Sequence, residues 1–300
     1  MVLSDNIRGA ALMAISMAAF VSNDTLVKLV SSDLGLFQIL FLRGIMATAA
    51  LIVIAHFRGQ LFVSLERRDI GVMALRLIGE IGATMSFLTA LFNMPLANVT
   101  AILQALPLAV TLGAAVFLRE SVGWRRLSAI AIGFTGVLII VRPGTEGFNS
   151  FATFALLSVG FVVLRDLSTR RLGSKVPSIF AALMTSIAVT TIGALAVPFS
   201  DWHPVQAPQL TALAGSTVFL VIGYLSSVMT MRVGEIAFVA PFRYTAMIWA
   251  ILLGFLVFGQ FPDNWTLLGS AVVIAMGLYS FYRERVRHRL IVAPRHARMP

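Results

Sequence analysis

Apolar runs long enough to cross a lipid bilayer recur along this chain, and they leave few alternatives to a bundle of membrane helices. Each run is close to the ~20 residues that a helix needs to span the hydrocarbon core. The composition agrees, because 58% of the residues are hydrophobic and 12% are charged, against about 45–50% and about 25% in soluble domains. We therefore predict an all-α integral membrane protein with ten transmembrane helices, at residues 9–30, 36–57, 70–92, 97–118, 127–141, 151–169, 178–198, 210–231, 236–258 and 265–282.

The residue types that are present exclude most catalytic and metal chemistry. The absence of cysteine excludes disulfides, thiolate metal sites and cysteine redox chemistry. The four histidines all fall in predicted loops or in the C-terminal tail, so a histidine metal site inside the membrane is not expected. The sequence shows no paired carboxylates, no Ser/His arrangement and no Walker-type lysine motif. We expect no enzyme activity, no metal and no cofactor.

The positions of the basic residues predict the topology. If the N-terminus is cytoplasmic, 17 of the 23 Lys and Arg residues fall on cytoplasmic segments and one, Arg142, falls outside. This is the asymmetry that the positive-inside rule requires of ten helices with both termini in the cytoplasm. The net charge of +10 is therefore a topology signal rather than a sign of nucleic-acid binding, and we predict a multi-pass protein of the bacterial inner membrane. The basic tail, residues 284–300, is expected to contact anionic lipid headgroups.

The second half of the chain repeats the first with its basic loops reversed across the membrane. A shift of 142 residues pairs Asp24 with Asp166. Two basic loops of the first half correspond to loops without Lys or Arg: residues 58–69 to 200–210, and 119–126 to 259–265. An odd number of helices per half inverts the second half, which explains the reversal. We predict two inverted five-helix halves, residues 1–143 and 144–283, with a substrate site between them near the midplane.

The fourth span and the turn after it hold a recognisable set of residues: Pro107, Glu120, Trp124, Leu127, Gly133, Gly136 and Val137. In these residues the chain resembles the EamA-type carriers of the drug/metabolite transporter superfamily. The similarity extends over residues 8 to about 283. The second copy departs from the pattern, because Met247 and Gln260 stand where the proline and the glutamate are expected and Pro241 comes earlier.

Within that superfamily, the chain is most similar to the YddG-type exporters of aromatic and other neutral amino acids. The resemblance implies alternating access by rocking of helix bundles around a central cavity, with no cofactor and no ATP site. It implies a small-molecule substrate, an amino acid or a similar metabolite, and membrane lipid as the surroundings. Since two halves in one chain supply a complete pathway, a monomer is sufficient.

Charged side chains at membrane depth are costly, so we expect each of them to face a partner or a cavity. Asp24 and Lys28 are four residues apart in the first span and share a helix face. Either Lys28 neutralises Asp24, or Asn23 and Asp24 line the outward part of the pathway. Arg43 in the second span is expected to pair with Asp24 or Asp33, as a gate or as a tie between helices.

The third and sixth spans hold further charges. Arg76 and Glu80 are four residues apart, and we expect them to form an internal ion pair rather than a binding site. Arg165 and Asp166 are adjacent and therefore point to different faces, which leaves one of them as a candidate for the inner gate. Further candidates for the cavity wall are Thr84 and Phe87 on the third span and Tyr224 and Ser227 on the eighth.

Two spans contain a proline within the helix. Pro107 follows Gln104 in the fourth span, and Pro241 precedes Arg243 in the ninth; each proline is expected to kink its helix, because proline removes a backbone hydrogen bond. Arg243 has no acidic residue within a turn and lies too deep to reach the membrane surface. It either binds a substrate carboxylate through its guanidinium fork or pairs with Asp166 or Glu80 across the bundle. Further substrate-contact candidates are Gln104, Tyr244 and Trp249.

The leading functional prediction is an inner-membrane secondary transporter that exports neutral and aromatic amino acids and related small metabolites. The charges within the spans, five positive and three negative, suit a zwitterion or an anion better than a lipophilic cation. Proton-coupled efflux of drugs or lipophilic cations is the alternative, with Asp24 as the coupling acid. Export of another small metabolite, such as a nucleoside, also stays open.

Overall fold

The computed structural model describes residues 2–120, 122–145, 148–173, 175–233 and 236–292, and these residues contain helices and no strands. Ten helical segments are long and apolar enough to cross a membrane, which agrees with the predicted number. The elements are α1 (Val2–Val30), α2 (Leu36–Phe57), α3 (Arg67–Asn93), α4 (Leu96–Leu103), α5 (Leu106–Phe117), α6 (Trp124–Val141), α7 (Ala152–Arg171), α8 (Ser178–Ala196), η1 (Val197–Phe199), α9 (Ala207–Val233), α10 (Ile236–Val239), η2 (Ala240–Tyr244), α11 (Thr245–Phe258) and α12 (Asn264–Val292).

The helix ends differ most from prediction at the chain termini. The first helix begins several residues before the predicted start at residue 9. The last helix continues through Val292, so the basic segment from residue 284 is not a separate tail over most of its length. Arginine, glutamate and leucine are good helix formers, which allows the helix to continue after its apolar part has ended. Residues 293–300 of the predicted tail lie outside the described residues.

Both proline-containing spans are broken rather than merely bent. The fourth span divides into α4 and α5 at Gln104 and Ala105, and Pro107 lies in the first turn of α5. The ninth span passes through the 3₁₀ segment η2, with Pro241 in its first turn. A first turn suits proline, because the N–H groups there have no partner within the helix. In the described residues, the helix is thus interrupted beside each of these two prolines.

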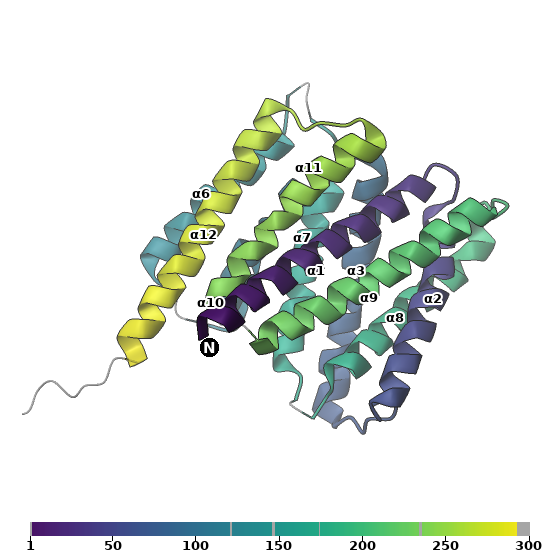
Figure 1. Ribbon diagram of the computed structural model, residues 1–300, viewed down its shortest axis with the longest axis horizontal. Helices are drawn as coiled ribbons and strands as arrows, with labels where there is room; N and C mark the ends of the chain where they lie inside the picture. The colour runs from purple at the N-terminus through teal and green to yellow at the C-terminus, as the bar shows by residue number, and fades with distance from the viewer. Residues whose placement is uncertain (1, 121, 146–147, 174, 234–235, 293–300) are drawn as a thin grey trace, which may run out of the picture.

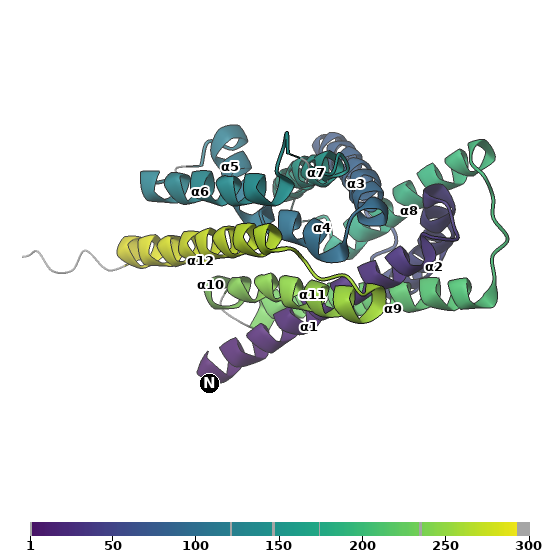
Figure 2. The same ribbon diagram turned by 90° about the horizontal axis from the view of Figure 1, so that it is seen from above.

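The helices form two layers closed by a helix pair at each side. Figure 2 shows α3 and α7 in one layer and α1, α9 and α11 in the other, with α4 between them. The pair α6–α12 lies at one side of the bundle and the pair α2–α8 at the opposite side (Figures 1 and 2). In the predicted repeat, α1 corresponds to α7 and α9 corresponds to α3. The α1–α9 pair therefore corresponds to the α7–α3 pair, and both pairs are in extensive contact. This packing supports the proposal of two inverted halves.

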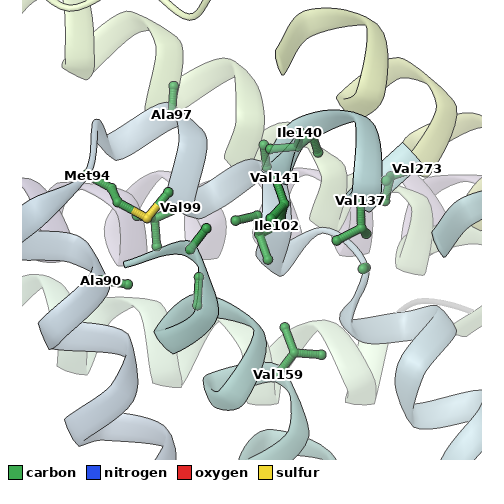
Figure 3. Close-up of a cluster of buried hydrophobic side chains, with 14 of the residues drawn as sticks. Ala90, Met94, Ala97, Val99, Ile102, Val137, Ile140, Val141, Val159 and Val273 are labelled. Atoms are coloured by element: carbon green, nitrogen blue, oxygen red, sulfur yellow. The ribbon is translucent and has the colours of Figure 1, made fainter. Parts of the chain in front are cut away.

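The largest cores lie toward one face of the bundle. We call the face with the 58–66 and 172–177 loops the terminal face, because α1 begins and α12 ends there (Figure 1). The far face is the opposite one. One core cluster joins α3, α4, α6, α7 and α12 through residues such as Met94, Ile102, Ile140 and Val273 (Figure 3). A second cluster joins the far half of α1 to α2, α3 and α11. The far half of the bundle is therefore the more densely packed one.

Glycines bring the backbones of α6 and α12 into contact. A Cβ on Gly269 would lie 2.6 Å from the carbonyl oxygen of Gly136 and 2.6 Å from Cγ1 of Ile140. A Cβ on Gly136 would lie 2.8 Å from the carbonyl oxygen of Gly269. Small residues allow such close approach between membrane helices, where dispersion contacts provide much of the association energy. This pair is therefore a fixed unit of the fold.

We predict that Gly269→Ala separates α6 from α12 and destabilises the protein by about 1–3 kcal/mol, the usual cost of overpacking. Thermal unfolding in detergent should show a lower midpoint than the wild type. The matched control is Gly160→Ala on α7, where an added Cβ meets no atom within 4 Å. Equal midpoints for the two variants would contradict the glycine contact.

Candidate functional site

A cluster of opposite charges lies in the terminal half of the bundle. Arg165 on α7 contacts Glu80 on α3, with 3.4 Å between Nη1 and Oε2. Its Nε donates a hydrogen bond of 2.9 Å to Oδ1 of Asp166. The Asp166 side chain is 37% exposed, although it lies within a membrane-spanning helix. Exposed charge at this depth is expected where a pathway opens to water.

Arg243 completes this cluster from the second layer. It lies in η2, where the broken helix interrupts the ninth span, and its residue is exposed. Asp166 and Arg165 are within electrostatic range of its guanidinium. Among the described residues, however, Arg243 has no hydrogen bond or ion pair to another side chain, so its donors remain available for a ligand.

The predicted Arg76–Glu80 ion pair is wrong, since Glu80 contacts Arg165 instead. Arg76 Nε donates to Oγ1 of Thr169 at 3.0 Å, and its Nη1 donates to the carbonyl of Ala181 at 3.3 Å and to the hydroxyl of Thr185. Arg76 thus ties α3 to α7 and α8. Helical spacing indicated a contact within α3, but the long guanidinium side chain reaches acceptors on neighbouring helices.

The prediction that Arg165 and Asp166 point to different faces is also wrong. The arginine side chain is long enough to fold back on the carboxylate of its neighbour. Arg165 therefore bridges two acids, Asp166 on its own helix and Glu80 on α3. Both acids stay partly exposed, so the cluster presents negative as well as positive groups to a ligand.

In the far half, Lys28 does not pair with Asp24 as one reading predicted. Its ammonium donates to the carbonyls of Leu91 at 2.5 Å and Met94 at 2.7 Å, and it lies 5.6 Å from the ring centroid of Phe258. The last carbonyls of a helix lack partners within that helix and attract cations. Lys28 therefore caps the far end of α3.

Asp24 has different neighbours. Asn23 Nδ2 donates to its Oδ1 at 2.9 Å, and Arg43 on α2 is within electrostatic range. Asp33, the other partner predicted for Arg43, accepts a hydrogen bond of 2.9 Å from Gln209 on α9 instead. In the described parts of the chain, the Arg43 guanidinium makes no direct hydrogen bond or ion pair.

The uncharged candidates fall into three places. Thr84 borders a gap between α2, α3 and α8 that has no room for water, while Phe87 and Trp249 pack on the far-half core. Gln104 and Tyr244 are buried at the two helix breaks. Tyr224 and Ser227 are half-buried on α9, and Arg76 is within electrostatic range of Tyr224. The structure therefore brings Arg165, Asp166 and Glu80 into direct contact, but it does not gather the uncharged candidates around them.

The Tyr244 ring points away from the charge cluster in this state. It packs on Gly277 of α12, where an added Cβ would overlap the phenol, and its centroid is 6.4 Å from that of Phe281. Among the described residues, the Tyr244 hydroxyl and Gln104 Nε2 have no hydrogen-bond partner. Substrate contact by either residue stays a proposal.

The two layers meet at the far face and separate at the terminal face. In the far half, α4 packs on α11, and Lys28 joins α1 to the end of α3. In the terminal half, α5 packs on α6 and α7, and within the described chain it has no comparable contact with α10 or η2. The charge cluster lies in this terminal half, where fewer contacts join the two layers.

Two further ties across the far face were not foreseen from the sequence. Gln38 Nε2 donates to the carbonyl of His203 at 2.7 Å, and the His203 amide donates back to Oε1 at 3.2 Å. Arg142 forms an ion pair with Asp263. The sequence did contain a signal for the ion pair, since Arg142 is the one basic residue predicted outside and Asp263 lies in a loop on the same side.

Comparison with known proteins supports the fold and gives relatives with transporter names. Residues 7–142, a little less than half of the chain, match the EamA-like transporter family. A solved crystal structure with 20% sequence identity superposes with a TM-score of 0.61 over 92% of this chain and 98% of that one, which supports the ten-helix fold. With its ten apolar helices, the chain is a multi-pass membrane protein that is similar to transporters.

The relatives of this transporter carry different small molecules. It is 25% identical to the S-adenosylmethionine uptake transporter of Rickettsia felis, over 94% of this chain and 95% of that protein. It is 28% identical to the riboflavin transporter of Vibrio cholerae, over 70% and 71%. It is 26% identical to the pseudopaline exporter CntI of Pseudomonas aeruginosa, over 89% and 93%. These names support a transporter rather than an enzyme, and they do not single out the YddG-type exporters.

We predict that the Arg142–Asp263 tie is independent of pH near neutrality. Partial burial alone would raise the pKa of Asp263, but hydrogen bonds from Thr266 and Arg142 outweigh it, so the pKa lies below its ordinary value of 3.8. Because the folded-state pKa is the lower one, the pair stabilises the protein above the unfolded pKa and this stabilisation is lost as pH falls through the folded pKa. Asp263→Asn should lower the thermal midpoint at pH 7, and its effect should disappear as the pH falls through the folded-state pKa of Asp263, which lies below 3.8.

We also predict opposite thiol reactivity at the two repeat-related aspartates. The chain has no cysteine, so single variants need no cysteine-free background. Asp166→Cys should react with a membrane-impermeant maleimide from the terminal face, whereas Asp24→Cys should react much more slowly from either face. Equal rates for the two variants would contradict a pathway that opens only at the terminal face.

Proposed function

We propose that this transporter exports neutral amino acids and related small metabolites that carry an α-amino-acid group. The N- and C-termini lie in the cytoplasm, as the basic loops predict, so the terminal face is the cytoplasmic side of the bacterial inner membrane. The open end of the pathway then faces the cytoplasm, where an exported metabolite enters.

The charge cluster of Glu80, Arg165, Asp166 and Arg243 carries this proposal. The free guanidinium of Arg243 matches a substrate carboxylate, because its planar fork donates two parallel hydrogen bonds. The partly exposed acids Glu80 and Asp166 can accept hydrogen bonds from the substrate ammonium. A zwitterionic head group therefore finds both of its partners within one cluster.

Alternating access follows from the positions of these groups. Arg243 belongs to the second layer, while Arg165, Asp166 and Glu80 belong to the α3–α7 layer. A substrate that binds both sides draws the layers together at the terminal face, and the weaker ties at the far face can then open. Transporters with inverted repeats place their substrate at such an interface between moving units.

A second candidate is transport of a larger amino-acid derivative. The full-length similarity to S-adenosylmethionine uptake transporters favours it. S-adenosylmethionine has the same zwitterionic head group and an additional sulfonium charge, which the two acids of the cluster could offset. Proton-coupled efflux of lipophilic cations has less support, because the cluster also holds two arginines.

We predict saturable transport of labelled leucine or phenylalanine into proteoliposomes, and loss of most of it in Arg243→Ala. Loss of a hydrogen bond between charged groups costs about 1.5–3 kcal/mol, so the half-saturation concentration should rise about tenfold or more. Arg243→Lys should restore only part of the affinity, since an ammonium lacks the bidentate fork.

The control is Arg125→Ala, an exposed arginine stacked on Trp124 outside the cluster. Assays run with and without a proton gradient, and with labelled S-adenosylmethionine in parallel. Transport of S-adenosylmethionine but of neither neutral amino acid would favour the second candidate. Gradient-driven movement of a lipophilic cation, with no amino-acid transport, would contradict the proposal.

A further inference from the structure

The charge cluster has a counterpart in the far half of the bundle. Residues 23 and 24 of the first half correspond to residues 165 and 166 of the second. In each pair, the side chain of the first residue donates a 2.9 Å hydrogen bond to Oδ1 of the aspartate. Asp24 lies within two turns of the far end of α1, and Asp166 lies within two turns of the terminal end of α7. The two aspartates therefore lie at similar depths from opposite faces.

Each aspartate also has an arginine close by that makes no direct contact. Arg43 is within electrostatic range of Asp24, and Arg243 is within electrostatic range of Asp166. Neither guanidinium has a hydrogen bond or an ion pair to a side chain in the described structure. The arginines come from different helices, α2 in one case and η2 in the other. The same combination of an acid and a free guanidinium has thus formed in both halves.

The far-half group also contains a buried polar atom without a partner. Asn23 is 4% exposed, and its Oδ1 has no hydrogen-bond partner among the described residues. A buried acceptor left unpaired costs about 1–3 kcal/mol, so such atoms call for an explanation. Lys28 does not donate to this oxygen, because its ammonium already caps α3. A ligand with N–H donors would satisfy this atom.

We propose that Asn23, Asp24 and Arg43 form a second binding site for the amino-acid head group, used when the far face is open. The Arg43 fork takes the carboxylate, and Asp24 with Asn23 Oδ1 takes the ammonium. This inference rests on the proposed function, since the ligand is the same. The substrate leaves the Asp166–Arg243 site as the terminal face closes and meets the Asp24–Arg43 site before it exits.

A purely structural role for Asp24 and Arg43 leads to different expectations. A structural ion pair would be in direct contact and would hold α1 to α2 in both states. Loss of such a pair would lower the amount of folded protein, or it would lower the maximal transport rate. Either effect would be the same for substrate from both faces. A binding site that is accessible from one face changes the apparent affinity for substrate from that face.

The test compares transport affinity from the two sides. Right-side-out and inside-out membrane vesicles are prepared from cells that express the full chain, and initial uptake of labelled leucine is measured over a range of concentrations. Thiol labelling of an Asp201→Cys variant identifies the preparation that presents the far face, because Asp201 is exposed in the loop before α9. The variants are Asp24→Asn, Arg43→Gln and Asn23→Leu.

We expect each variant to raise the half-saturation concentration about tenfold or more for substrate at the far face, and less than about twofold at the terminal face. Arg243→Gln should show the reverse. Asp201→Asn, the same chemical change as Asp24→Asn at an exposed loop position, should alter neither value. Because Asn23→Leu also removes the hydrogen bond to Asp24, the amount of folded protein is compared with wild type before its affinities are interpreted.

Three outcomes separate the claims. A far-side change in affinity supports the second site. Equal changes on both sides, or a fall in maximal rate alone, overturns the second site while leaving amino-acid export intact. Wild-type vesicles that move no amino acid overturn the proposed function, and the second site falls with it.

Discussion

The structure depends on how buried charge and broken backbone are accommodated without water. Inside a bilayer each polar group needs a partner, and a charge needs either an opposite charge or access to solvent. The chain meets this requirement in different ways. Lys28 caps the carbonyls at the end of α3, and Arg76 bonds to hydroxyl and carbonyl groups on α7 and α8. Arg43 and Arg243 are the exceptions among the charges described, and both lie beside an aspartate.

The helix count and the broken spans could be predicted from the sequence because they depend on local properties. A run of apolar residues fixes a membrane helix regardless of its neighbours, and a proline disrupts the helix wherever it falls. The charge partners could not be predicted in the same way. Helical spacing paired Asp24 with Lys28 and Arg76 with Glu80, but Lys28, Arg76 and Glu80 find their partners on other helices. Long cationic side chains reach across a helix interface, so three-dimensional packing decides which acceptor they meet.

The predicted repeat proved more informative than the individual pairings. It placed Asp24 and Asp166 at equivalent positions, and the structure gives both aspartates the same hydrogen bond from the preceding side chain. The repeat did not indicate which arginine accompanies each aspartate, because Arg43 and Arg243 have no counterparts under the 142-residue shift. The feature common to both halves is therefore the hydrogen-bonded aspartate on α1 and α7. The neighbouring arginine comes from a different position in each half. In the proposed mechanism, this difference would give the two sites different affinities for the same substrate.

The strengths of the contacts indicate which parts move. Backbones approach closely within helix pairs, as at Gly136 with Gly269 and at Gly79, where a Cβ would lie 2.8 Å from the amide nitrogen of Arg165. Helices packed this closely cannot slide past each other without overlap of their backbones. Between the layers at the far face, Lys28 on α1 donates to two carbonyls at the end of α3, and such charge-assisted hydrogen bonds contribute about 1.5–3 kcal/mol each. A transporter needs two states of similar free energy. The far face is also closed by the apolar cluster that joins α1, α2, α3 and α11, so its opening must separate these side chains as well as break the polar ties.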